Sequence, residues 1–316
     1  MNQEQALKIK KSEVLFLYQS TYSIPNGDPF TGEQRYDDET KKILVSDVRI
    51  KRFIRDYLDQ QGEEIYVVPD KGESLVAEGE SKKKGEAGAA LRINALKTKY
   101  KSSLDWKKAK SSDVLDLLSQ CLDVRLFGGI CTKEGAAVNL TGPVQFALLN
   151  PSLNKVDMRM HQNTSVFVSN EANKQGSIGT TTVVPYSLIQ IHGWINPYSA
   201  LDTNLNDEDI QKMFKALWNS INNANTRSKS NQDSLLLLQV VYSDPTRKVY
   251  DLANKIKIEA EKQDEALRGR EDYKINFNAL KELVSSGLIE SVNYFTEDLQ
   301  IEAELSGSKF KKMNWS

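Results

Sequence analysis

The residues with the clearest chemistry lie in one basic segment, residues 46–57 (SDVRIKRFIRDY). Its apolar residues recur at helical spacing and, together with Leu58 just after the segment, form one stripe: Ile50, Phe53, Ile54, Tyr57 and Leu58. Its cations spread over the opposite side: Arg49, Lys51, Arg52 and Arg55. The pattern predicts an amphipathic helix with one core face and one cationic face. The alternative interpretation is a solvated basic face on a scaffold helix.

Ser46 stands where the N-cap of this helix is expected, which leaves backbone N–H groups pointing out at that end. A cationic helix with an open N-terminus suits a polyanion, above all a phosphate backbone. The preceding loop, 23–29 (SIPNGDP), places Asn26 and Gly27 between two prolines. Because Gly27 has no side chain, backbone amides of this loop are able to approach a sugar-phosphate closely.

Other candidate contacts are more widely spread. Arg125 precedes Phe127 and Gly128, where a charge and a small packing surface meet. Arg227 and Lys229 follow a strongly periodic helix and are placed to clamp a phosphate. The alternative for these three cations is a surface charge or a helix C-terminal cap, and Phe127 is more often a core residue. The two cysteines and two histidines do not predict a zinc site, and no cofactor is expected.

Charge is unevenly distributed along the chain, although the net charge is only −1. Residues 81–110 hold ten Lys/Arg against two acids, whereas residues 251–305 hold thirteen acids against seven bases. A basic edge is able to bind a polyanion, and complementary edges allow head-to-tail stacking of copies. Such heterologous contacts produce rings or helical filaments.

The chain has 316 residues, 39% of them hydrophobic, which fits one large globular domain. No apolar run is long enough to span a membrane, and Met1–Lys11 lacks the apolar region of a secretory signal. The cytoplasm, with Cys121 and Cys131 reduced and buried, is therefore the expected location.

The pattern predicts a buried strand over 12–22, a possible strand over 64–68, and an exposed, mobile insertion over 69–89. Helices are expected over 91–100 and 112–122, the second capped by Ser112, and a turn over 123–129. Strands are expected over 137–149, 181–195 and 234–242, with a hairpin or long loop between at 151–180. A helix capped by Asn206 and a helix–strand pair at 278–286 and 288–295 follow, and the tail from Lys309 is expected to be loose. The order of the core elements is that of a split βαβ, as in ferredoxin-like and RNA-recognition folds.

Seven segments in this order resemble one family. They are Asn26–Pro29, the 46–57 helix, Asp123–Gly128, Thr141–Phe146, His161–Thr164, Val184–Tyr186 and Thr226–Ser228. The chain thereby resembles the repeat-associated (RAMP) backbone subunit of CRISPR Cascade complexes, the Cas seven or DevR-like family, in its subtype I-B, Csh-type form.

The resemblance implies an α+β fold: an RNA-recognition (ferredoxin-like) palm with an antiparallel sheet, helical finger insertions and a projecting thumb hairpin. The implied boundaries are a palm at 12–68, 137–150 and 181–300, fingers at 69–136 and a thumb at 151–180. It further implies that Arg159, Met160, His161 and Gln162 of the thumb wedge against a displaced guide base.

The implied function is a scaffold that binds guide crRNA, polymerises head-to-tail along it and presents it for pairing with target DNA. Phosphate contacts hold any guide sequence alike, and specificity is delegated to the guide. The implied partners are crRNA, target DNA, copies of itself, a guide 5′-end cap subunit, large and small subunits, and a repeat-processing endoribonuclease, with no membrane involved.

Two enzymatic alternatives remain open at this stage. Type III relatives carry a loop aspartate that cuts target RNA, and Asp28 or Asp37 lies in a comparable loop here. Some relatives process repeat RNA with a histidine, for which His161 is the candidate. None of these three candidates has a second acid or base placed by sequence spacing, so we expect no enzymatic activity.

Overall fold

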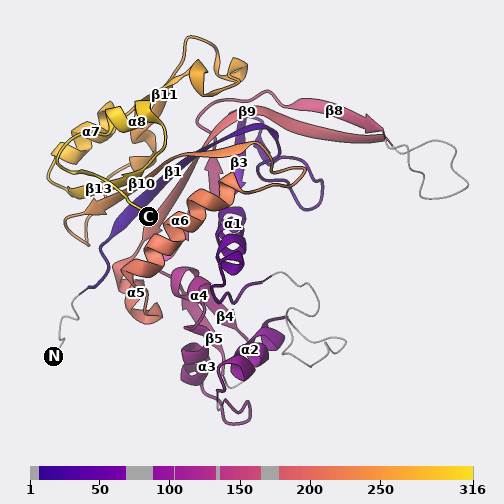
Figure 1. Ribbon diagram of the computed structural model, residues 1–316, viewed down its shortest axis with the longest axis vertical. Coiled ribbons are helices and arrows are strands. Elements are labelled where there is room, and N and C mark those ends of the chain that lie inside the picture. The colour runs from indigo at the N-terminus through magenta and orange to yellow at the C-terminus, as the bar shows by residue number, and fades with distance from the viewer. Residues whose placement is uncertain (1–6, 69–87, 103, 133–135, 165–177, 316) are drawn as a thin grey trace, which may run out of the picture.

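The computed structural model describes residues 7–68, 88–102, 104–132, 136–164 and 178–315. Its fold is α+β, built on a mainly antiparallel sheet of order β14-β13-β10-β1-β9-β6, with β8 paired to β9 (Figure 1). The strands are β1 Ser12–Ser23, β6 Val144–Phe146, β8 Arg159–Thr164, β9 Ile178–Ile195, β10 Gln232–Tyr242, β13 Ile289–Phe295 and β14 Phe310–Lys312.

Strand β1 lies at the centre of this sheet, between β9 and β10. Val14, Phe16 and Tyr18 point into one hydrophobic core, and Leu15 and Leu17 point into a second core on the opposite face. A strand buried on both faces reads as a continuous apolar run rather than an alternating one. This is why the sequence predicted it correctly.

Two helices cover one face of the sheet. Helix α1 (Asp47–Gln60) and helix α6 (Asp207–Asn222) pack side by side there (Figure 1). Asn206 caps α6, as predicted. All six periodic apolar residues of α6 are buried: Ile210, Met213, Phe214, Leu217, Trp218 and Ile221. The short helix α5 (Pro197–Thr203) precedes α6.

The C-terminal third covers the other face with the second core. The predicted helix–strand pair is confirmed as α7 (Asn278–Ser285) followed by β13. The remaining elements of this layer are η2 Leu252–Lys255, β11 Lys257–Glu259, η3 Asp264–Ala266, η4 Arg270–Asp272, β12 Lys274–Asn276 and α8 Leu299–Glu304. The centre of the sheet is therefore covered on both sides.

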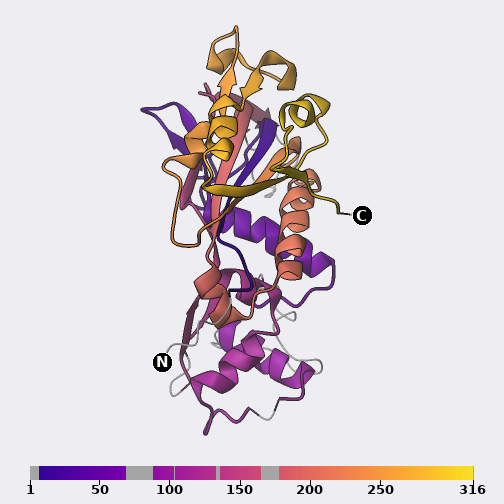
Figure 2. The same ribbon diagram turned by 90° about the vertical axis from the view of Figure 1, so that its left-hand side faces the viewer.

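A separate lobe extends from one end of the sheet and has its own core (Figure 2). It contains α2 Gly88–Lys99, α3 Ser111–Leu118, α4 Leu122–Phe127, and the hairpin of β4 Gly128–Cys131 with β5 Val138–Thr141. A small three-stranded sheet pairs two strands that precede α1, β2 Tyr36–Asp37 and β3 Lys42–Ser46, with the later strand β7 Leu149–Pro151.

Four local predictions in and beside this lobe differ from the structure, two of them only in their bounds or continuity. Residues 64–68 form no strand, because the buried Asp123 carboxylate accepts the N–H groups of Tyr66 and Val67. Residues 123–129 are not a turn but the end of α4 followed by β4. The helix predicted over 112–122 starts at Ser111, with Lys110 rather than Ser112 at the N-cap, and ends at Leu118. The strand predicted over 137–149 is two short strands, β5 and β6, divided at Gly142-Pro143, where proline lacks the N–H a ladder needs, and β7 begins only at residue 149.

The tail is also not loose. Strand β14 pairs in parallel with β13, and the Trp315 ring stacks on Phe295 with centroids 3.9 Å apart. An aromatic pair of this kind fixes a chain end that composition alone marks as solvated. The Gly-, Lys- and Glu-rich segment 69–87 lies outside the described residues, and residues 88–89 begin α2.

Candidate nucleic-acid interface

The N-terminal end of α1 is held to the loop before it by one asparagine. Asn26 Oδ1 accepts hydrogen bonds from the Ser46 backbone N–H at 2.7 Å and from Ser46 Oγ at 2.8 Å. Ser46 Oγ accepts in turn from the Arg49 N–H at 3.3 Å, which confirms the predicted N-cap. Asn26 is buried. Both residues therefore fix the loop against the helix.

The loop also closes tightly on itself around Gly27. A Cβ added there would lie 3.2 Å from the Gly32 carbonyl oxygen, so a larger residue would require that carbonyl to shift by a few tenths of an ångström. Asp28 Oδ1 accepts the N–H of Phe30 at 2.9 Å, and these contacts lower the pKa of its carboxyl. Asp28 thus has a structural role in the turn.

A groove of about 540 Å³ opens at this end of α1. Three arginines line it: Arg35, Arg49 and Arg52. Arg35 forms a salt bridge to Asp28 with a 3.3 Å N–O distance, although its Nε is buried without a hydrogen-bond partner. The groove is therefore cationic and incompletely neutralised.

Arg49 is the least compensated of these cations. Its guanidinium lies over the Phe53 ring, with Cζ 3.8 Å from the centroid, and its Nε is buried without a hydrogen-bond partner. Within the described part of the chain it forms no salt bridge. Burial lowers its pKa. Beneath it, the fully buried Tyr18 hydroxyl also has no partner, and burial raises its pKa.

Lys229 reaches the same region from the turn after α6. Its Nζ donates to the Ile24 carbonyl oxygen at 2.5 Å and to Ser228 Oγ at 3.3 Å. Burial and the repulsion of Arg49 lower the pKa of Lys229 to about 8. Arg49 and Lys229 are both partly buried, and neither forms a salt bridge within the described residues, so together they create a local attraction for an anion.

Unlike Arg49 and Lys229, the remaining cations of α1 each have an acidic partner. Lys51 lies 3.3 Å from Asp47, and Arg52 Nε lies 2.6 Å from Asp56. Arg55 Nε lies 2.8 Å from the fully buried Asp123. Three of the four cations predicted on this face are therefore paired with acids, and Arg55 helps to hold α1 to the lobe.

Arg125 is engaged even more completely. Its guanidinium makes two hydrogen bonds of 2.8 Å to Asp209 of α6 and a third, at 2.9 Å, to the Ser119 carbonyl oxygen. Asp209 raises the pKa of Arg125. Arg125, predicted as an RNA contact, thus forms a link between the lobe and α6.

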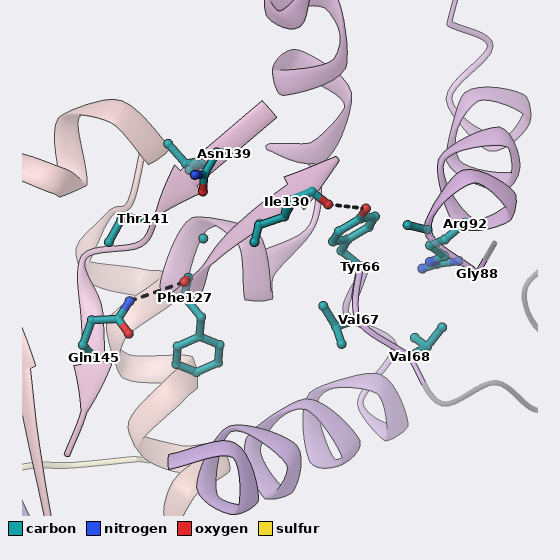
Figure 3. A pocket seen from close by; sticks show the side chains of 14 residues that line it. Tyr66, Val67, Val68, Gly88, Arg92, Phe127, Ile130, Asn139, Thr141 and Gln145 are labelled. Carbon is teal, nitrogen blue, oxygen red and sulfur yellow. Dashed lines mark hydrogen bonds between the residues drawn. The ribbon is translucent and has the colours of Figure 1, made fainter. Parts of the chain in front are cut away.

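Phe127 and Gly128 line a second cavity of about 620 Å³, between the lobe and α1 (Figure 3). The Phe127 ring has the cations of Lys51 and Arg55 at 5.7 and 5.2 Å from its centroid. Lys51 also donates to Gln145, which lines the same cavity, at 3.0 Å. Lys51 therefore lies between the two hollows on either side of α1.

The remaining predicted residues lie apart from both hollows. Four exposed residues sit on β8 of the projecting hairpin: Arg159, Met160, His161 and Gln162. They pair with Thr180–Val183 of β9, and Figure 1 shows this hairpin extending away from the sheet. Arg227 is exposed in the turn that carries Lys229.

Sequence reasoning missed Arg35, which lines the groove. It also missed two residues beside the groove: Tyr18, which is buried beneath Arg49, and Phe30, which follows Pro29 in the chain. A phenylalanine between Pro29 and Thr31 in a turn, without apolar neighbours in sequence, was the available signal.

Comparison with known proteins defines the class. Over 97% of its length, the chain is similar to a chain of a "CRISPR RNA-guided surveillance complex, pre-nicking", at a TM-score of 0.56 and 13% identity over 96% of that chain. A chain of another "CRISPR RNA-guided surveillance complex" has a TM-score of 0.55 and 12% identity over 95% of its length, again with 97% of this chain covered. These two similarities establish the fold.

The family follows from the sequence comparisons. The model of the family "CRISPR-associated protein Cas7" matches residues 10–278. A CRISPR-associated protein Cas7 from Haloferax volcanii is 28% identical over 297 residues, which covers 87% of this chain and 82% of that protein. The chain belongs to the Cas7 family.

Two other features are absent from the part of the chain that the structure describes. The described residues contain no group of three or more His, Cys, Asp or Glu side chains placed to hold a metal ion. No helix among them is both long and apolar enough to cross a membrane.

Proposed function

We propose that this protein is a crRNA-binding scaffold that polymerises along the guide and forms the backbone of a type I Cascade complex. It presents guide bases for pairing with target DNA and has no catalytic role of its own. The groove at the N-terminal end of α1 holds the sugar-phosphate backbone. In this proposal the hairpin of β8 and β9 is the thumb, and it contacts the guide at a neighbouring position.

The uncompensated pair of Arg49 and Lys229 carries this proposal. Holding two like charges together without a counter-ion disfavours the charged folded state. A phosphate group placed between them removes this penalty and gains charge-assisted hydrogen bonds. Contacts of these two cations to phosphate do not read the edges of the bases, so the interaction suits any guide sequence.

The sheet supports an RNA-recognition-like palm. Strands β10, β1, β9 and β6 lie in the order 4-1-3-2 when renumbered along the chain, and α1 and α6 cover one face. This is the arrangement of a split βαβ fold. The face opposite α1 and α6 is covered by the C-terminal third, so we place the RNA at the end of α1 rather than on the sheet.

The test is the salt dependence of RNA affinity in charge-matched variants. We expect Arg49→Gln and Lys229→Gln each to weaken binding and to reduce the slope of log affinity against log salt by about 0.7, the value for one lost phosphate contact on a single strand. Lys215→Gln, which removes an exposed lysine of α6, is the control and should change neither. An unchanged slope in both groove variants would show that this groove does not hold the RNA.

A further inference from the structure

Unpartnered polar atoms gather at and beneath the cationic groove. In the part of the chain that the structure describes, ten buried side-chain nitrogen and oxygen atoms have no hydrogen-bond partner. Four of them belong to this one place: Arg35 Nε, Asp47 Oδ1, Arg49 Nε and the Tyr18 hydroxyl. Buried polar groups are nearly always paired, because an unpaired one keeps the full cost of leaving water. This concentration therefore indicates a hydrogen-bond network that is completed in another state of the protein.

Two of the four residues lack any side-chain partner. Arg35 and Asp47 each form a salt bridge through another atom, to Asp28 and to Lys51. Within the described residues, the side chain of Tyr18 has no hydrogen bond, and that of Arg49 has neither a hydrogen bond nor a salt bridge. The incomplete part of the network is therefore the hydroxyl of Tyr18 and the guanidinium above it.

The position of Tyr18 is fixed by its surroundings. Its side chain is fully buried, and its ring stacks on Phe16 with centroids 5.7 Å apart. The pairing of β1 with β10 shifts in register between Leu17 and Tyr18, and irregularities of this kind re-aim the side chains beside them. Because the ring is held on a central strand, a partner for its hydroxyl has to come from a longer and more adaptable side chain.

Arg49 is the charged side chain that acts on this hydroxyl. Burial raises the pKa of Tyr18, and the Arg49 charge opposes that effect. The Arg49 guanidinium lies over the Phe53 ring, with Cζ 3.8 Å from the centroid, and Phe53 belongs to the same core as Tyr18. Arg49 Nε–H is a donor without an acceptor, and the neutral hydroxyl oxygen of Tyr18 is able to accept. A rotation of the Arg49 side chain would pair the two.

We propose that Tyr18 is a positioning residue for Arg49: in the RNA-bound protein its hydroxyl accepts the Arg49 Nε–H and holds the two Nη groups toward the phosphate. This inference rests on the proposed function and names the residue that sets the geometry of its least compensated cation. Committing Nε to Tyr18 leaves both Nη groups for phosphate oxygens and reduces the freedom of a flexible side chain. Tyr18 does not touch the strand, because it is fully buried.

The first test is Tyr18→Phe, which removes the hydroxyl and keeps the ring. Because this hydroxyl has no partner in the structure, we expect the midpoint of denaturant unfolding without RNA to stay the same or to rise. RNA affinity should fall about tenfold, since a hydrogen bond to a charged group is lost. The slope of log affinity against log salt should not change, because no charge is removed.

Tyr273→Phe is the matched control. Its hydroxyl is also buried, but it lies in the second core and is 2.8 Å from the Tyr186 hydroxyl. Here we expect the opposite result, a lower unfolding midpoint with unchanged RNA affinity. A similar loss of stability in Tyr18→Phe would overturn the proposal, because it would show that the Tyr18 hydroxyl is already paired without RNA.

A double-mutant cycle separates positioning from packing. Arg49→Lys keeps the charge but removes the Nε–H, so Tyr18→Phe should have no effect on RNA affinity in the Arg49→Lys background. An equal loss of affinity in both backgrounds would overturn the proposal, since the hydroxyl would then act without Arg49.

The remaining outcomes distinguish this inference from the proposed function. Unchanged RNA affinity of Tyr18→Phe, with a reduced salt slope in Arg49→Gln and Lys229→Gln, would overturn the positioning role and leave the phosphate groove intact. Absence of RNA binding by the wild type would refute the proposed function and this inference with it.

Discussion

The titration of Lys229 gives the groove a measurable signature at the scale of a single residue. Its pKa is about 8 in the folded protein, against an ordinary value of 10.5. Between these values the unfolded chain holds a proton that the folded protein has released. Stability of the RNA-free protein therefore rises with pH across that window, and the cost of the buried charge is fully present below pH 8.

RNA binding should show the opposite pH dependence. Because a phosphate needs the protonated lysine, we expect affinity to fall between pH 7 and pH 9, by at most about tenfold per pH unit for one linked proton. Fluorescence anisotropy across this range measures it. Lys229→Arg is the control, since arginine stays charged and its binding should be nearly flat with pH. A wild-type affinity that does not change over this range would contradict a role for the Lys229 charge.

For arginines that are paired with a carboxylate, we expect substitution to change protein stability and not the salt dependence of RNA binding. Arg125→Ala leaves the nearly buried Asp209 carboxylate without its partner, and breaking such a pair costs about 3–5 kcal/mol. We expect a lower midpoint of denaturant unfolding with an unchanged salt slope for RNA binding. The exposed pair of Arg52 with Asp56 gives a comparison, since Arg52→Ala should cost about 0.5 kcal/mol or less. Equal stability of the two variants would show that the Asp209 contact contributes little.

These residue-level differences could not be predicted from the 46–57 segment alone. Its periodicity correctly predicted the helix, the N-cap and the buried stripe, because those depend on neighbours in sequence. The partner of Arg55 is 68 residues away and that of Lys51 at Gln145 is 94 residues away. Which cations remain uncompensated is therefore a tertiary property.

At the scale of elements, the lobe depends on a close crossing of two backbone segments. A Cβ on Gly142 would lie 2.1 Å from the carbonyl carbon of Phe127, and a Cβ on Gly128, whose φ is +84°, would lie 2.0 Å from the Leu140 carbonyl oxygen. Side chains cannot be accommodated at these distances. Gly128, which sequence reasoning assigned to RNA binding, thus has a structural reason to be glycine.

We expect Gly142→Ala to destabilise the lobe by about 3 kcal/mol, because backbone atoms rather than flexible side chains block the added carbon. Gly129→Ala is a matched control one residue from Gly128, since its Cβ would meet only side-chain atoms, of Val124 at 3.4 Å and of Tyr66 at 3.7 Å. Hydrogen exchange of α3 and the β4–β5 hairpin would measure the difference. Equal protection in the two variants would show that the crossing relaxes easily.

Whether an element was predicted correctly from the sequence depended on whether neighbouring or distant residues determine it. Strand β1 and helix α6 were predicted because their apolar patterns are long and regular. The lobe was predicted poorly because its short elements are set by Gly142 and Asp123, whose effects depend on segments distant in sequence. The tail was misread because composition did not reveal the contact of Trp315 with Phe295.

At the scale of the whole molecule, both faces of the central strands are covered, so ligand-binding surfaces are limited to edges, loops and projections. The cationic groove lies at the N-terminal end of α1, which packs against the sheet, whereas the hairpin of β8 and β9 extends away from the sheet (Figure 1). A single strand that reaches both surfaces is most simply shared between adjacent copies. A shared strand couples binding to polymerisation.

This coupling predicts that the guide sets the number of copies. Mass photometry of the protein with RNAs of increasing length should show complex masses that rise in equal steps, with one more copy for each fixed increment of RNA. Arg49→Gln with Lys229→Gln should reduce assembly at all lengths, whereas Lys215→Gln should not. The same complexes, given complementary RNA and a divalent metal ion, should produce no cuts that depend on Asp28, because its carboxylate is occupied by the turn. A constant one-to-one mass at every RNA length would refute the filament, and regular cuts lost in Asp28→Ala would replace the scaffold with a nuclease.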